Sequence, residues 1–124
     1  MAIRIVRLGS PRAPGEGLRL GTVRRPPRGV RKSDYAKLNY YDLWLPDLAP
    51  SQKLVTRALK SWDGIPRLYR REMQAPAAER LLGLLAALSH QTHFSVGCYC
   101  EDEERCHRSV LRDLLHEHGA NLAS

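Results

Sequence analysis

A short apolar run from His93 to Cys100 lies between two helical patterns, and this arrangement constrains the fold more than any other feature of the sequence. The run predicts a buried β-strand because it is short and rich in strand-forming residues. The pattern before it repeats leucines from Pro76 to Leu88, and the pattern after it extends from Cys106 to His118. A strand between two helices is typical of a layered α/β fold.

The rest of the chain completes this fold. Strands are expected over residues 2–8, 18–24 and 40–45, a helix between Ser51 and Gly64, and a short helix over 66–74. Leu54, Val55, Ala58, Leu59 and Trp62 recur on one face of the helix that Ser51 begins. The element order β-β-β-α-α-α-β-α predicts one α/β domain over residues 1–124, with a short, mostly parallel sheet flanked by helices. The chain from 40–45 to 93–100 then forms a right-handed parallel crossover.

Length and composition limit the cellular context. The 124 residues suit a single domain, and no stretch is long and apolar enough for a membrane span. The N-terminal residues are too charged for a signal peptide, and three cysteines are an odd number. We therefore expect a cytoplasmic protein with reduced thiols and no membrane partner; the oligomeric state is left open.

The net charge of +7 is concentrated in one region. Residues 1–32 carry nine basic residues and one acidic residue, a net charge of +8, whereas residues 33–124 carry a net charge of −1. Such a region attracts phosphate groups, nucleic acid or an acidic partner. It is equally typical of a solvated face that only keeps the protein soluble. A nucleic-acid-binding module that uses this region is one of two alternatives to the main hypothesis below.

All three cysteines lie within nine positions, in Cys98-Tyr99-Cys100 and Cys106-His107-Arg108. The first pair ends the expected strand, and Cys106 stands at the first turn of the last helix, after the acidic loop 101–105. Ligands of open α/β folds bind at the carboxyl ends of the strands. A helix N-terminus also favours an anion, and a thiolate is an anion. This stretch is therefore the predicted site.

Three interpretations of the site stay open. Cys106 can be an activated nucleophile or redox thiol that His107 or Arg108 assists, which makes Cys106 and His107 the candidate catalytic residues. Alternatively, Cys98, Cys100, Cys106 and His107 bind zinc, although the spacing is unusual and neighbouring residues would have to reach one ion. In the third interpretation the cysteines are small buried apolar residues, no cofactor is bound, and His107 is a satisfied residue at the helix start.

A second candidate element is the loop Arg24-Arg25-Pro26-Pro27-Arg28-Gly29. Its prolines stiffen the backbone, so Arg24 and Arg28 would be presented at low entropic cost for bidentate contact with a phosphate. If this loop lies over the strand–helix turn, the two elements form one anion pocket. The main hypothesis is a small anionic, phosphate-bearing ligand contacted by Arg24, Arg28, Arg108 and Ser109.

These residues also resemble a known family. The loop, Leu48-Ala49-Pro50-Ser51, the helix with Tyr69 and Glu72-Met73, and Cys98 with Cys106-His107-Arg108-Ser109 are similar to the short, single-domain branch of the domain-of-unknown-function family 488. The loop lacks the aspartate and tryptophan usual in that branch, and some relatives have asparagine where Cys106 stands. The resemblance implies an α/β fold, a pocket at this location, and His107 and the loop arginines as shared elements. It implies no particular reaction.

Overall fold

The computed structural model describes residues 1–102 and 105–123, and its elements confirm the predicted α/β fold and element order. The strands are β1 (Ile3–Arg7), β2 (Leu18–Gly21), β3 (Leu43–Trp44) and β4 (Phe94–Cys98). The α-helices are α1 (Gln52–Lys60), α2 (Ile65–Glu72), α3 (Pro76–Leu88) and α4 (His107–Glu117). Two short 3₁₀ turns, η1 (Lys32–Asp34) and η2 (Pro46–Leu48), flank β3.

The four strands form one parallel sheet in the order β1-β4-β2-β3. The central strand β4 pairs with β1 from Phe94 to Cys98 and with β2 from Phe94 to Gly97. All five of its residues are buried, as expected for a central strand of a parallel sheet. Because the strands are parallel, β1, β2 and β4 all end at the same edge of the sheet.

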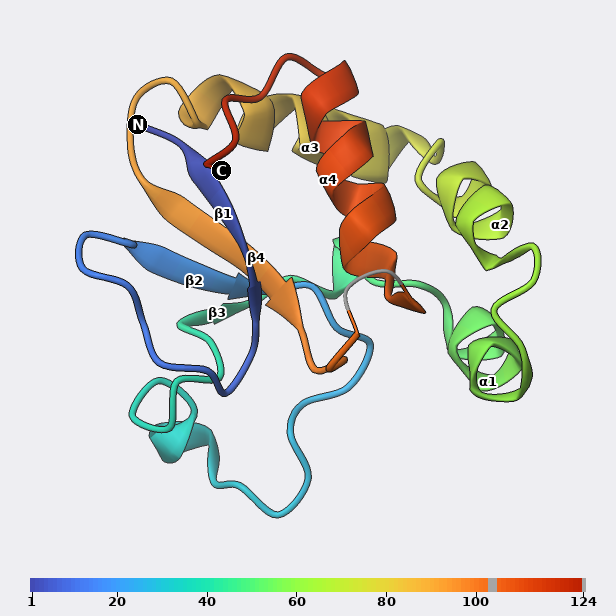
Figure 1. Ribbon diagram of the computed structural model, residues 1–124, viewed down its shortest axis with the longest axis horizontal. Coiled ribbons are helices and arrows are strands. Elements are labelled where there is room, and N and C mark those ends of the chain that lie inside the picture. The colour runs from blue at the N-terminus through green and yellow to red at the C-terminus, as the bar shows by residue number, and fades with distance from the viewer. Residues whose placement is uncertain (103–104, 124) are drawn as a thin grey trace.

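The helices lie above and to the right of the sheet in Figure 1, and the long loop after β2 lies below it. Helix α4 packs against β4 and contacts α2 and α3, while α1 packs against α2. The main core lies between α4 and the sheet and includes Ile3, Leu82, Val96, Leu111 and Leu115. This packing fixes the first turn of α4 next to the carboxyl end of β4. None of the helices in the described residues is both long and apolar enough to cross a membrane.

Several element boundaries differ from the expectation. The third strand was expected over 40–45 but contains only Leu43 and Trp44, because a left-handed residue, Asn39, turns the chain just before it and Pro46 begins η2 just after it. Gly64 does not end α1; it adopts a left-handed conformation and precedes α2. The apolar face expected on α1 is only partly covered, since Leu54 is buried but the side chain of Leu59 is 84% exposed. The chain from β3 to β4 does form a parallel crossover, as expected, and it passes over the intervening strand β2.

One arginine of the basic N-terminal region is internal. Arg19 is fully buried and donates hydrogen bonds to both carboxylate oxygens of Glu16, at 2.8 and 3.0 Å. Its guanidinium also donates to the carbonyls of Ser10 and Asn39. Arg19 therefore ties the loop after β1 to the loop before β3, and its charge is not available on the surface.

Candidate functional site

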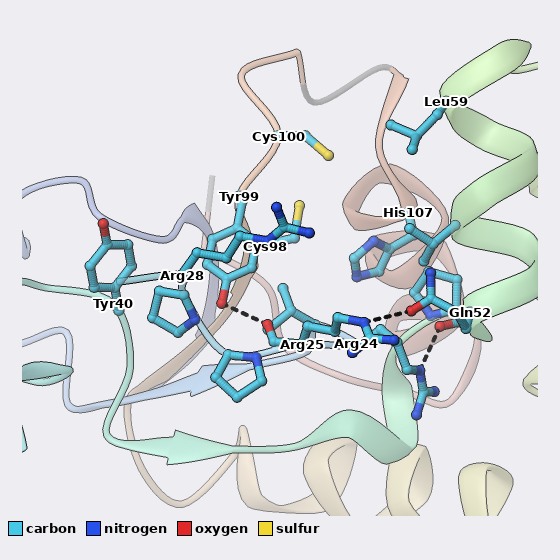
Figure 2. A pocket seen from close by; sticks show the side chains of 15 residues that line it. Arg24, Arg25, Arg28, Tyr40, Gln52, Leu59, Cys98, Tyr99, Cys100 and His107 are labelled. Carbon is cyan, nitrogen blue, oxygen red and sulfur yellow. Dashed lines mark hydrogen bonds between the residues drawn. The ribbon is translucent and has the colours of Figure 1, made fainter. Parts of the chain in front are cut away.

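A cavity of about 550 Å³ lies at the carboxyl edge of the sheet, where the sequence predicted a site. Its walls come from the loop Val23–Arg28, one face of α1, the segment Cys98–Cys100 at the end of β4, and His107 of α4. Tyr40 closes the side away from α1 (Figure 2). The predicted meeting of the arginine loop with the strand–helix turn is therefore present.

His107 is held in one orientation and one protonation state. It is the first residue of α4, and its Nε2 lies 2.7 Å from the carbonyl oxygen of Thr22. A carbonyl only accepts, so Nε2 carries the proton and donates, which leaves Nδ1 unprotonated. Nδ1 lies 3.8 Å from the sulfur of Cys106. Burial lowers the pKa of His107 to about 4, so the imidazole is neutral at neutral pH.

The three cysteine sulfurs converge next to the start of α4. Those of Cys98, Cys100 and Cys106 all lie within 4.8 Å of one another. The structure joins Cys98 and Cys106 as a disulfide, with their Cα atoms 7.8 Å apart. The end of β4 and the start of α4 bring these two sulfurs together, and the expectation of reduced thiols stays a prediction. Cys100 is the free cysteine, and it is exposed.

Cys106 itself does not line the cavity. It caps α4, is 1% exposed and packs with Cys98, Leu8 and Val23. A substrate in the cavity would meet Cys100, not Cys106. Although Cys100 as a residue is exposed, neighbouring atoms desolvate its thiol and raise the pKa, and the charge of Arg108 only partly opposes this. Cys100 is thus a protonated thiol at neutral pH, which is unlike a pre-ionised nucleophile.

Two other predicted site residues hold the turn itself. Arg108 is buried, and its Nη2 donates a hydrogen bond of 2.6 Å to the carbonyl of Cys100. The hydroxyl of Ser109 donates to the carbonyl of Cys106 at 3.0 Å. Neither residue lines the cavity, so both position the segment that carries the cysteines. Of the predicted acidic loop, residues 103 and 104 lie outside the described residues.

The loop arginines have different environments. Arg24 donates to the backbone carbonyls of Pro46, Ala49 and Pro50 at 3.0–3.2 Å, so it anchors the loop to the start of α1. Arg25 donates to the side chain of Gln52 at 2.8 Å. Arg28 is exposed, and within the described part of the chain its guanidinium makes no hydrogen bond or ion pair. In Figure 2 it extends across the cavity toward Tyr99 and the cysteine sulfurs.

Sequence reasoning missed residues that support the site from a distance. Thr22 orients His107, and Tyr69 stacks edge-on against its ring at 5.3 Å between centroids. The hydroxyl of Tyr99 donates to the carbonyl of Arg25 and so fixes the arginine loop. Thr22 and Tyr99 each follow a strand that ends at the site edge, and this position is the one sequence signal that marks them.

Comparison with known families agrees with this geometry. The family described as DUF488-N3a, Active DUF488-N3 subclade, matches residues 3–119. The chain therefore belongs to this subclade of the domain-of-unknown-function family 488, as the resemblance of its motifs implied. No curated protein and no solved structure matches the chain.

Proposed function

We propose that this member of the domain-of-unknown-function family 488 binds a small organic anion in the cavity, with the charged group of the ligand on Arg28. The observation that carries the proposal is the Arg28 guanidinium, which faces the cavity and has no partner in the described residues. A guanidinium presents several donors in one plane and forms bidentate bonds to carboxylate, sulfonate or phosphate groups. Arg24 and Arg108 serve as positioning residues, since their guanidinium groups hold backbone carbonyls.

The rest of the cavity suits the organic part of such a ligand. Val23, Val55 and Leu59 line one side, and Pro26 and Pro27 add apolar surface. The volume of about 550 Å³ lies within the roughly 300–1,000 Å³ typical of small-molecule sites. Exposure of Leu59 at this mouth is consistent with apolar contact by a ligand. The preferred ligand is therefore an anion on an apolar or aromatic body, not a bare inorganic ion.

The exposed thiol of Cys100 would lie next to this ligand. Because the pKa of the thiol is raised, Cys100 has a contact role in the free protein and not that of a pre-ionised nucleophile. His107, neutral and buried, donates to the Thr22 carbonyl and shapes the base of the cavity. Binding thus depends on Arg28 first and on the thiols second.

Isothermal titration calorimetry with three probes tests this proposal: phenyl phosphate, inorganic phosphate and neutral benzyl alcohol, each added to metal-free, reduced protein. We expect phenyl phosphate to bind most tightly, because only it offers both the charge and the apolar body. Arg28→Gln should weaken its binding about tenfold or more, since a hydrogen bond to a charged group contributes about 1.5–3 kcal/mol.

The matched control is Arg80→Gln, which removes the same charge from an exposed position on α3 outside the cavity. This variant should bind phenyl phosphate as the wild type does. Equal loss of affinity in both variants would show that only overall charge matters. Equal affinity for phenyl phosphate and benzyl alcohol would contradict an anion site.

A further inference from the structure

We infer that the thiol form of the cluster Cys98, Cys100 and Cys106, together with Nδ1 of His107, binds one zinc ion. This inference goes beyond the anion site and does not depend on Arg28. Three cysteine sulfurs lie within 4.8 Å of one another. The Nδ1 of His107 lies 3.8 Å from one of them, the sulfur of Cys106, and would be the fourth donor of a Cys₃His zinc site. The set draws on the end of β4 and the first turn of α4, two elements that the core holds rigidly together.

The distances fit ligands of a shared ion. Two sulfurs on a tetrahedral zinc lie about 3.8 Å apart, because each Zn–S bond is about 2.3 Å. The Cα atoms of Cys98 and Cys106 are 7.8 Å apart, whereas disulfides usually hold these atoms about 4.4–6.8 Å apart. A zinc ion between the two sulfurs would span this wider separation, so the backbone geometry favours two ligands of one ion.

The imidazole of His107 lies beside one of the three sulfurs, that of Cys106. The sequence raised the objection that adjacent residues would have to reach one ion, but the Nδ1 of His107 and the sulfur of Cys106 lie 3.8 Å apart. Sulfur and nitrogen ligands on one tetrahedral zinc lie about 3.6 Å apart. The other ring nitrogen donates to the Thr22 carbonyl, which is the usual outer contact of a metal-bound histidine. This contact leaves the lone pair of Nδ1 available to bind the zinc ion.

Zinc binding changes the thiols in a defined way. As each S–Zn bond forms, the corresponding S–H bond breaks and the proton passes to the solvent. The imidazole loses no proton, because its Nδ1 is already unprotonated. No oxidation or reduction is involved, although the cluster must start as three thiols, since a disulfide uses two of the donor sulfurs.

The test uses the full chain, reduced with a phosphine, stripped of metal and kept without oxygen. Native mass spectrometry should then find one zinc ion per chain after zinc is added. Cobalt(II) in its place should give thiolate charge-transfer absorption and tetrahedral d–d bands. Cys100→Ser should lower the zinc affinity at least tenfold, and its exposed position keeps the fold intact. Cys106→Ser should do the same, and serine is a favourable residue at the N-cap position of α4 that Cys106 occupies.

Two control variants show whether zinc binding is specific to this cluster. His93→Ala removes an exposed histidine outside the cluster and should leave zinc binding unchanged. Arg28→Gln should also leave it unchanged, although that variant should lose phenyl phosphate binding. Zinc affinity that is equal in the wild type and Cys100→Ser, or no bound zinc in the reduced chain, would overturn the inference without affecting the anion site.

Discussion

At the scale of single residues, the site depends on which arginine side chains already have hydrogen-bond partners inside the protein. Arg19, Arg24 and Arg108 all use their guanidinium groups on internal partners, and Arg28 does not in the described residues. Sequence alone cannot make this distinction, because the partners of Arg24 are backbone carbonyls about 25 positions away. Every residue type has a backbone carbonyl, so the sequence does not show which carbonyl will accept a hydrogen bond. The arginine loop lines the cavity, as predicted, whereas the sequence did not reveal that backbone carbonyls hold Arg24.

The buried pair of Glu16 and Arg19 makes a prediction about acid stability. Burial alone would raise the pKa of Glu16, but hydrogen bonds from Arg19 and Ser95 outweigh it and lower the pKa from 4.5 to about 2. The carboxylate therefore stabilises the fold above about pH 4.5, and this contribution is lost as the pH falls toward 2. Glu16→Gln should unfold at lower urea concentration at pH 7, and its stability should depend less on pH in this window.

The measurement is urea unfolding of the wild type and Glu16→Gln at a series of pH values. Arg19→Met is the harsher companion variant. It leaves the Glu16 carboxylate buried without its cation, so we expect a loss of about 3–5 kcal/mol in the free energy of unfolding. Parallel pH profiles for the wild type and Glu16→Gln would contradict the role assigned to this carboxylate.

At the scale of elements, the sequence predicted those with strong periodicity. Helices α3 and α4 and the strand β4 lie within two residues of their expected bounds, because repeated apolar positions and proline or glycine boundaries mark them. Strand β3 was overestimated, since Tyr40 and Tyr41 belong to the turn that packs against the end of β2. The location of the site followed from strand ends, which is a topological rule and needs no knowledge of side-chain contacts.

The start of β2 provides a test of sheet packing. Gly17 has φ +81°, and a Cβ atom there would overlap the carbonyl of His93 just before β4. Gly15 has φ +72°, but nothing lies within 4 Å of its would-be Cβ. Alanine at either position costs about 1–2 kcal/mol for the left-handed backbone. Gly17→Ala should lower the free energy of unfolding by about a further 1–3 kcal/mol, because the added Cβ atom pushes β2 away from β4.

Thermal and urea unfolding of both alanine variants distinguish these contributions. Gly15→Ala serves as the matched control for backbone conformation alone. If the two variants lose the same stability, the close approach of β2 to the His93 carbonyl does not limit the packing of this edge.

At the scale of the whole molecule, the charge asymmetry of the sequence is only partly a surface property. Of the arginines in residues 1–32, Arg19 is enclosed and Arg24 is bound to carbonyls, so fewer charges than the sequence suggests can meet a polyanion. A basic surface of this kind attracts anions in general, and the proposed anion site would benefit from the remaining charge. Nucleic-acid binding through this region stays a prediction. The cavity at the carboxyl edge of the sheet is a more specific feature than the basic surface.

If Arg28 draws anions to the thiol side of the cavity, alkylation of Cys100 should depend on the charge of the reagent. Iodoacetate and iodoacetamide have similar shape and reactivity but differ in charge. Mass spectrometry of metal-free, reduced protein gives the rate of each reagent at Cys100 in the wild type, Arg28→Gln and Arg80→Gln. We expect the ratio of the iodoacetate rate to the iodoacetamide rate to fall several-fold in Arg28→Gln alone. An unchanged ratio in Arg28→Gln, or an equal fall in Arg80→Gln, would contradict the anion site.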